Sequence, residues 1–269
     1  MDPTLNPRTR LRPYNGPGLF ITGTGTDVGK TVVTAALAGA FQRMHLRVGI
    51  CKPIASGCPK WPQRGNDPSH ALTDDDLQSP DAAFAARAAG LDPADESLRP
   101  YLSPLRYAAP VAPFVAARVE GRPPNWRRVE AALDWWQENC QVLLIEGSGG
   151  WYSPLDEHDF MNADLAAALR LPVLVVTHAR LGAINDLLLT IHAIQEHHLA
   201  VAGMVINRVP APGRRDLAVT TNLEELPRWS GVPVRAVLPE GDISGGVPEA
   251  FVEAMGDFAR AWWQLVAPV

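Results

Sequence analysis

Lysine is almost missing from this chain. Lys30, Lys52 and Lys60 are the only lysines among 269 residues, and arginine fills the other basic positions. The two side chains are not interchangeable, because an ammonium group is a compact point charge whereas a guanidinium group is a planar fork. Lys30 and Lys52 each stand in a loop behind an apolar run. We therefore predict that both sites require an ammonium group.

Cysteine pairs, long apolar runs and an excess of positive charge are also missing. The three cysteines are odd in number and none forms a C-x-x-C pair, which argues against a disulfide framework or a zinc site. No stretch approaches the length of a membrane span, and residues 1–17 lack the apolar core of a signal peptide. The formal net charge of −5 disfavours a nucleic-acid or membrane surface as partner. We expect a cytoplasmic protein that acts on small molecules, with residues 1–17 as a disordered arm.

Apolar runs alternate with helical patterns along most of the chain. Strands are expected at 18–22, 47–51, 141–146, 172–177, 200–207 and 232–238. Helices are expected at 30–43, 161–170, 183–197, 216–229 and 248–265. This alternation is typical of a doubly wound α/β fold, with a mostly parallel sheet of about seven strands and helices on both faces.

The domain organisation follows from the length and from one interruption of this alternation. With 46% apolar residues, residues 18–269 are long enough to bury one substantial core, so a single domain is expected. Residues 56–125 contain many prolines and only two short helical patterns, near 81–89 and 111–119. We interpret them as an insertion that shapes the functional site.

A glycine-rich segment, Gly-Thr-Gly-Thr-Asp-Val-Gly-Lys-Thr at 23–31, separates the first expected strand from the first helix. A loop so placed surrounds phosphates with backbone N–H groups and the positive end of a helix. Lys30 would then reach the β and γ oxygens, and the Thr31 hydroxyl would hold Mg²⁺. Five residues, rather than four, separate Gly23 from Gly29, so the loop departs from the standard P-loop. The segment predicts a nucleoside triphosphate site on a P-loop NTPase-like fold.

Two more strand ends should lie at the same edge of a parallel sheet. Glu146 ends an apolar run and precedes Gly-Ser-Gly-Gly, where a carboxylate can hold magnesium; it could also cap a helix or pair with an arginine. Lys52 could snorkel from its strand end, or stabilise the charge that develops at a γ-phosphate. Ser56 and Gly57 follow on the same loop and could contact the phosphoryl acceptor.

Three adjacent carboxylates, Asp74, Asp75 and Asp76, precede one of the short helical patterns. Taken alone, they indicate a solvated loop. Because Mg²⁺ prefers one or two carboxylates beside phosphate oxygens and waters, one of them could also join Glu146 and Thr31 around a metal ion. The histidines show no metal-binding spacing, so surface roles are expected for them.

Five segments taken together, 22–31, 51–57, 145–151, 180–185 and 203–207, closely resemble the dethiobiotin synthetases. The resemblance implies an ATP-dependent ring closure. The substrate 7,8-diaminononanoate takes up CO2 (or bicarbonate) as a carbamate, the carbamate attacks the γ-phosphate, and the second amine closes a ureido ring. ADP and phosphate leave. The resemblance also implies a homodimer in which a second subunit completes the site.

The resemblance assigns roles to individual residues. ATP would contact Asp27, Val28, Gly29, Lys30, Thr31, Val32, Asp76, Glu146, Gly147, Ser148 and Gly149, and its adenine ring Asn207, Leu238 and Pro239. Mg²⁺ would be held by Thr31, Asp76 and Glu146. Lys52 and Lys30 would be catalytic. The substrate would contact Ser56 and, from the second subunit, Leu181, Gly182 and Asn185, at a helix N-terminus with the dipole sign that a carboxylate needs.

Two positions depart from the family pattern. The match at Asp76 is a short Asp-Asp-Asp-Leu run inside a variable insertion, so Asp75 is an alternative ligand. Relatives often carry a substrate-facing tyrosine near 214–221, where this chain has Val219. The way in which the substrate tail is held therefore stays open.

Two other functions use related loops. An amide-forming synthetase of the cobyrinate type would need a glutaminase domain, for which 269 residues leave no room. A partner-switching ATPase of the ParA and MinD kind carries a signature lysine early in its loop, where this chain has Gly25. Both are therefore kept only as alternatives to the synthetase.

Overall fold

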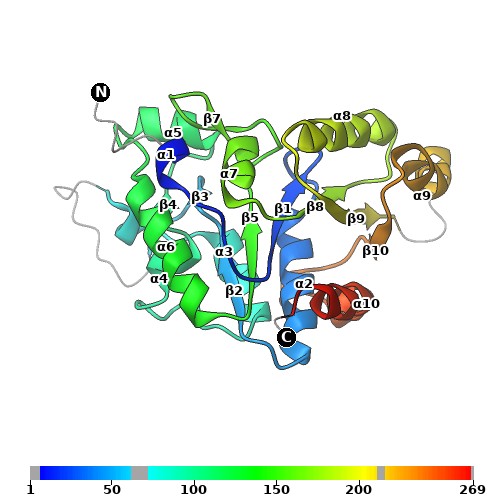
Figure 1. Ribbon diagram of the computed structural model, residues 1–269, viewed down its shortest axis with the longest axis horizontal. Coiled ribbons are helices and arrows are strands. Elements are labelled where there is room, and N and C mark those ends of the chain that lie inside the picture. The colour runs from blue at the N-terminus through cyan, green and yellow to red at the C-terminus, as the bar shows by residue number, and fades with distance from the viewer. Residues whose placement is uncertain (1–6, 62–71, 211–215, 268–269) are drawn as a thin grey trace.

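A central parallel sheet carries the functional site. The computed structural model describes residues 7–61, 72–210 and 216–267. In these ranges the strand order is β10-β9-β8-β1-β5-β2, and all neighbouring strands are parallel (Figure 1). The six strands are β1 (Gly18–Gly23), β2 (Val48–Cys51), β5 (Val142–Glu146), β8 (Val173–Thr177), β9 (Val201–Val209) and β10 (Val234–Pro239). The predicted doubly wound α/β fold is confirmed, with one strand fewer than the approximate seven.

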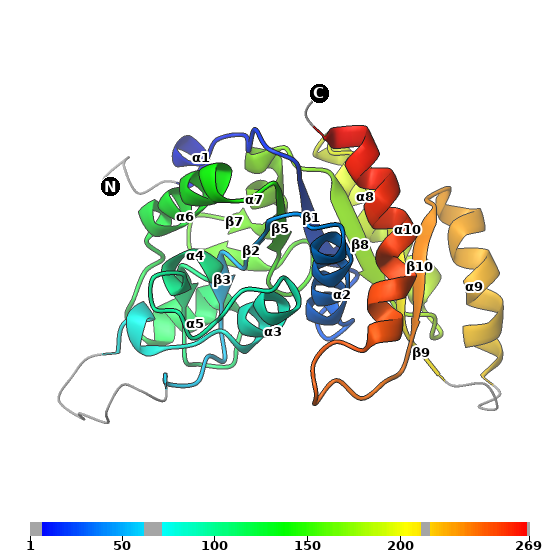
Figure 2. The same cartoon turned by 90° about the horizontal axis from the view of Figure 1, so that it is seen from below.

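Helices cover both faces of the sheet. On one face α2 (Lys30–Arg43) packs against α10 (Glu249–Val266), and on the other lie α7 (Asn162–Leu169) and α8 (Ala183–Glu196) (Figure 1, Figure 2). Beyond α8 lies α9 (Leu217–Ser230). Because the central strands are covered on both sides, they are apolar along their length instead of alternating. None of the helices in the described part of the chain has the length and apolar character of a membrane span.

The strand order brings three loops to one edge of the sheet. The chain runs from β1 through α2 to β2, returns to place β5 between them, and then continues to β8 on the far side of β1. The carboxyl ends of these strands therefore lie side by side. The residues that follow β1 and β2, together with the last residue of β5, are the predicted site segments.

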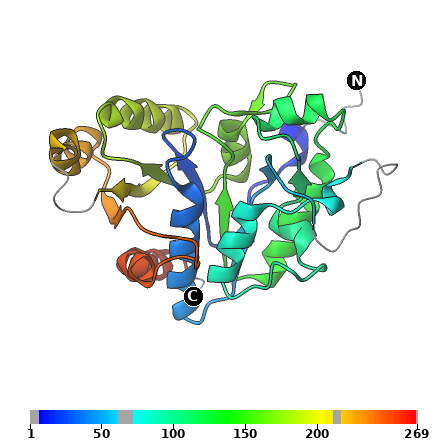
Figure 3. The same ribbon diagram turned by 180° about the vertical axis from the view of Figure 1, so that it is seen from behind.

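Short elements fill the predicted insertion between β2 and β5. They are β3 (Ile54–Ala55), η2 (Asp74–Asp76), α3 (Pro80–Ala88), α4 (Arg99–Leu102), β4 (Leu105–Arg106) and α5 (Pro113–Val119). Two of them, α3 and α5, confirm the two short helical patterns. Figure 3 shows α3 on the side of α2 that faces away from α10. The helix α6 (Trp126–Asn139), which was not predicted, packs against α4 and β2.

Residues 7–17 pack against the domain, which corrects the prediction of a disordered arm. They begin with α1 (Pro7–Arg10), and the following Leu11 is buried. Arg8 donates to the carbonyl of Asp159 at 2.6 Å, in the hairpin of β6 (Pro154–Asp156) and β7 (Phe160–Met161). Charge and proline content suggested disorder, but one apolar side chain and specific hydrogen bonds order the segment. Residues 1–6 lie outside the described residues.

Candidate functional site

Residues 24–29, here called the phosphate loop, connect β1 to α2. Gly29 has a φ of 90°, a left-handed conformation that glycine adopts without strain. A Cβ on Gly29 would lie 1.9 Å from Nδ2 of Asn207, so a larger residue would displace that side chain. Asn207, in β9, donates from Nδ2 to the carbonyl of Val28 at 2.9 Å. The loop is thereby held at the start of α2, where the first N–H groups of a helix have no helical partner.

Lys30, the first residue of α2, folds back over the phosphate loop. Its Nζ donates to the carbonyl of Gly25 at 3.1 Å, and the residue is only 6% exposed. Burial lowers the pKa of Lys30 below its ordinary value, although the nearby Glu146 carboxylate opposes this shift. The buried ammonium has one neutral hydrogen-bond acceptor. A charged acceptor, such as a phosphate oxygen, would stabilise it more strongly.

Two side chains from distant segments contact Glu146, the last residue of β5, and a third joins them through Lys52. The hydroxyl of Thr31 donates to Oε1 of Glu146 at 2.9 Å, and Nζ of Lys52 donates to the same oxygen at 2.9 Å. Nζ of Lys52 also contacts Oδ2 of Asp81 in α3. Burial alone would lower the pKa of Lys52, but the charges of Glu146 and Asp81 outweigh it and raise that pKa. Lys52 is therefore positively charged in the folded protein.

A cavity of about 690 Å³ opens over these groups. It is bounded on one side by the phosphate loop and the first turn of α2, and on another by α3 and residues 110–113. The predicted site residues that line it are Asp27, Gly29, Lys30, Thr31, Val32, Lys52, Ser56, Glu146, Ser148 and Gly149. Segments far apart in the sequence thus meet at one edge of the sheet, as the parallel topology requires.

Asp81 occupies the place that the sequence analysis gave to Asp76. Oδ2 of Asp76 accepts hydrogen bonds from the backbone and hydroxyl of Thr73 at 2.9 and 2.6 Å, and Asp76 does not line the cavity. Asp75 is also absent from the cavity and is bound by Arg128 at 2.6 Å. Sequence reasoning missed Asp81 because a carboxylate in the first turn of a helix is ordinary there. The structure thus brings Asp81, and neither Asp75 nor Asp76, to Lys52.

The residues expected at the adenine ring lie near the ends of β9 and β10. Asn207 is buried and holds the phosphate loop, while the Leu238 side chain is fully buried in the core and Pro239 is exposed. None of the three lines the cavity, so the adenine contacts stay a prediction. Arg208 and Ile243, which the sequence analysis did not single out, do line it.

Leu181, Gly182 and Asn185 lie at the start of α8, outside the cavity of their own chain. Leu181 is 87% exposed, and Gly182 adopts a left-handed φ of 94° ahead of the first helical residue. Asn185 is exposed as well. Their predicted contact with the substrate therefore stays a prediction.

The glycine-rich segment after Glu146 connects the site to the insertion. The hydroxyl of Ser148 donates to the carbonyl of Ile54 in β3. Gly149 has a φ of 73°, and a Cβ there would lie 2.1 Å from Oγ of Ser153. Gly147 packs against Phe20 and does not line the cavity. This segment brings backbone close to the cavity, where a side chain would not fit.

The oxygen atoms of Thr31, Glu146 and Asp81 suit Mg²⁺. The ion takes hard oxygen ligands in an octahedron at about 2.1 Å, which places adjacent ligand oxygens about 3 Å apart. The Thr31 hydroxyl and Glu146 Oε1 have this separation, at 2.9 Å. Within the three described ranges there is no cluster of three or more His, Cys, Asp or Glu that could hold a metal alone. A magnesium ion here would therefore complete its shell with water and phosphate oxygens.

Comparison with known proteins identifies the family. The family described as AAA domain matches residues 17–245. ATP-dependent dethiobiotin synthetase BioD 1 of Escherichia coli (strain K12) is 34% identical over 229 residues, which cover 84% of this chain and 94% of the relative. ATP-dependent dethiobiotin synthetase BioD of Saccharopolyspora erythraea is 39% identical over 245 residues, covering 90% and 93%.

Solved structures support the fold. The MinD protein of Pyrococcus horikoshii, complexed with Mg-ADP, superposes with a TM-score of 0.52 at 18% identity, covering 93% of this chain and 98% of that one. A ParA family ATPase of Chlorobium tepidum gives 0.52 at 13% identity, covering 91% and 98%. Identities this low show a shared P-loop NTPase-like fold alone. The similarity to the synthetases, in contrast, extends over nearly the whole of both sequences, and the chain belongs to the family of ATP-dependent dethiobiotin synthetases.

Proposed function

We propose that this protein closes the ureido ring of dethiobiotin from 7,8-diaminononanoate, CO2 and ATP. One amine of the substrate adds to CO2 and loses a proton, which gives a carbamate. A carbamate oxygen attacks the γ-phosphorus, and ADP leaves. The second amine attacks the carbonyl carbon of the resulting carbamic-phosphoric anhydride, expels phosphate and closes the ring. The enzyme is thus a ligase of biotin biosynthesis that forms C–N bonds.

The convergence of two ammonium groups on one cavity carries this proposal. Lys30 and the first N–H groups of α2 bind the phosphate chain of ATP. Lys52, which shares Oε1 of Glu146 with Thr31, stabilises the negative charge that spreads over the transferred phosphoryl group. Neither role needs a protein nucleophile, because phosphoryl transfer depends mainly on positioning and charge.

Thr31, Glu146 and Asp81 would hold Mg²⁺ in this reaction. When bound, the ion neutralises charge on the β- and γ-phosphate oxygens. In the ligand-free protein both carboxylates are engaged by Lys52 instead. Lys52 would be free to contact the phosphate once Glu146 and Asp81 served as ligands of the ion.

The acceptor substrate occupies the other side of the cavity. Ser56 lines this side together with Phe84, Pro110 and Pro113. A hydroxyl group among apolar side chains suits a molecule with polar amines on an alkyl chain. The chain's own Leu181, Gly182 and Asn185 would reach the substrate carboxylate of a neighbouring subunit in a homodimer. Sedimentation should then show a dimer, and replacing the exposed Leu181 with aspartate should weaken it.

ATP consumption with and without the diamine tests the proposal most directly. The purified protein is assayed with ATP and Mg²⁺, first alone and then with 7,8-diaminononanoate and bicarbonate. We expect strong stimulation by the two acceptor substrates together and a product that contains the ureido ring. ATP hydrolysis that ignores the diamine would reject a synthetase and favour a partner-switching ATPase.

A further inference from the structure

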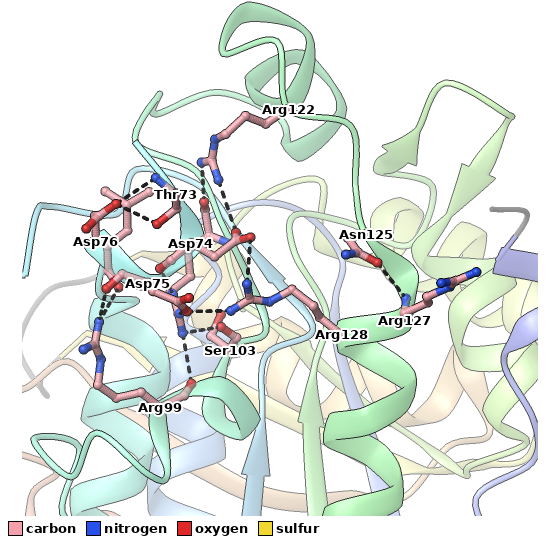
Figure 4. A network of polar contacts seen from close by, with 12 residues as sticks. Thr73, Asp74, Asp75, Asp76, Arg99, Ser103, Arg122, Asn125, Arg127 and Arg128 are labelled. Carbon is pink, nitrogen blue, oxygen red and sulfur yellow. Dashed lines mark hydrogen bonds and ion pairs between the residues drawn. The ribbon is translucent and has the colours of Figure 1, made fainter. Parts of the chain in front are cut away.

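An ionic network, buried at Arg99 and Arg106 and partly exposed at its other members, lies behind the acceptor side of the cavity. It joins the three-residue helix η2 to four arginines from separate segments (Figure 4). We call it the arginine network, and it consists of Asp74, Asp75, Arg99, Arg106, Arg122 and Arg128. None of its six residues lines the cavity.

Arg106, in β4, is the centre of the network and is 2% exposed. Its guanidinium donates to three carbonyl groups, those of Asp74 at 2.6 Å, Arg99 at 2.9 Å and Ser103 at 2.6 Å. It also contacts Oδ1 of Asp75 at 3.2 Å. A planar group with its donors engaged in this way fixes the relative positions of the three segments that it joins.

The backbone of β4 connects Arg106 to the acceptor side of the cavity. The strand pairs with β3, and the register places Ala55 opposite Arg106. The pairing continues from Gly57 N–H to the carbonyl of Ala109 at 3.0 Å. The residues next to this ladder, Ser56 on one side and residues 110–113 on the other, line the cavity. A shift of Arg106 would therefore move both segments.

The same network fixes the start of α3. Arg99 donates to the carbonyl groups of Asp75 at 2.8 Å and Leu77 at 3.3 Å. Two residues later Ser79 caps α3 by accepting from the backbone of Ala82 at 3.2 Å. Asp81 is in the first turn of that helix. The network thus sets the place from which Asp81 reaches Lys52.

The phosphate side of the cavity depends on other contacts. It is built from β1, the phosphate loop and α2, and Asn207 holds it from β9. The side chains of Arg106, Arg122 and Arg128 donate to residues 74–75, 99–106 and 120, which lie outside these elements. Breaking the network should therefore disturb the diamine directly, and should spare the binding of ATP when Mg²⁺, and with it the proposed role of Asp81, is left out.

We propose that the arginine network positions the acceptor side of the cavity, so that Asp75 and Arg128 act as positioning residues for the diamine and not for ATP. Both exposed and buried charge pairs are weak sources of stability, but such pairs can fix one geometry among several. This inference rests on the proposed synthetase function. It assigns the Asp-Asp-Asp run a role in substrate placement instead of metal binding.

Asp75→Asn tests the inference with little change in shape. The Asp75 side chain is about half exposed, at 49%, so the variant should fold. We expect the KM for 7,8-diaminononanoate to rise about tenfold, since small misplacements of a reacting group are costly. The dissociation constant for ATP, measured by calorimetry without Mg²⁺ so that Asp81 takes no part, should change less than about twofold. Arg128→Lys keeps the charge but loses the planar guanidinium group. It should raise the KM for the diamine by a smaller factor.

Asp257→Asn is the matched control. Asp257 also pairs with an arginine, Arg260, but its side chain is 96% exposed on α10. This variant should change neither constant. Equal losses in diamine and ATP binding for Asp75→Asn, or a lower melting temperature with both constants intact, would overturn the inference. If Asp75→Asn does not fold, the inference is tested with Arg128→Lys by the same two measurements, the KM for the diamine and the dissociation constant for ATP. Absence of diamine-dependent turnover in the unchanged protein would reject the proposed function itself, and the inference with it.

Discussion

Nζ of Lys52 lies 2.9 Å from Oε1 of Glu146, although 94 residues separate the two in the sequence. The register of two neighbouring strands explains their contact. Cys51 in β2 is paired with Ile145 in β5, so the next residue of each strand reaches the same edge of the sheet. A slip of one residue in this pairing would turn one side chain away from the other. The charge pair at the site is therefore a direct result of strand register.

Lys52→Arg should lower kcat by about 10²–10³-fold, which is the usual effect of losing one group that stabilises transition-state charge. The charge is kept, but a planar guanidinium cannot take the place of a compact ammonium between two carboxylates and a phosphate. The measurement is the steady-state rate of ADP release with saturating diamine and bicarbonate.

Lys60→Arg is the control for this variant, because Lys60 is the only lysine outside the cavity. Its rate should equal that of the unchanged protein. Full activity in Lys52→Arg would mean that any positive charge suffices. The prediction that this site requires an ammonium group would then be wrong.

Lys30→Met should abolish ATP binding and yet stabilise the ligand-free protein. Burial lowers the pKa of Lys30, so its charged form destabilises the folded protein when no phosphate is present. Removing that cost should add about 1 kcal/mol, or roughly 2–4 °C in melting temperature for a chain of this size. Thermal unfolding without nucleotide measures the gain, and calorimetry measures the loss of ATP binding.

The pH dependence of unfolding gives a second check on Lys30. Because its pKa is lower in the folded state, the unfolded chain binds more protons between that lowered pKa and the ordinary value of lysine. The contribution of Lys30 to the free energy of unfolding of the unchanged protein should therefore increase as the pH rises through this window. Lys30→Met should lack that contribution, and identical slopes for the two proteins would contradict the assignment.

Gly29→Ala should impair ATP binding about tenfold or more, beyond its effect on stability. An alanine there must adopt a φ of 90° and would also push Asn207 from its bond to the phosphate loop. Gly231→Ala separates the two effects, because Gly231 has a φ of 65° at the end of α9 with no atom within 4 Å of a new Cβ. It should cost about 1 kcal/mol and leave the KM for ATP unchanged. Equal KM values in the two variants would show that crowding at Asn207 is unimportant.

Leu11→Ala should lower the free energy of unfolding by about 2 kcal/mol without changing either KM. Leu11 is 7% exposed and belongs to the main core cluster, while its segment lies outside the cavity. Urea unfolding measures the loss. As a comparison, Leu265→Ala alters a leucine that is 79% exposed and should change stability by less than about 0.5 kcal/mol.

Much of the fold and several residues of the site follow from local sequence patterns. The phosphate loop, Lys52 and Glu146 were found because each follows or ends an apolar run, and parallel strands bring such positions together. Asp81 was missed because its partner, Lys52, is contributed by a different segment, and no local pattern reveals that pairing. The adjacent Asp74, Asp75 and Asp76 attracted the metal assignment, since the arginines that bind Asp74 and Asp75 come from residues 99–128.

The N-terminal segment also shows that local sequence patterns do not reveal partners from distant segments. Arg8 and its neighbouring charges and prolines predict disorder on composition. The contacts that order the segment are with residues about 120 to 150 positions away, such as Glu130 and Asp159. Composition cannot reveal such partners, because they depend on the completed tertiary structure.

The position of β5 between β1 and β2 also constrains biosynthesis. Until the ribosome has produced residue 146, the first two strands have no hydrogen-bonding partner between them, and Lys52 has no counter-charge from β5. The nascent chain must therefore hold two unpaired apolar strands while nearly one hundred further residues emerge. This interval is the stage at which chaperones, or aggregation, would act on the protein.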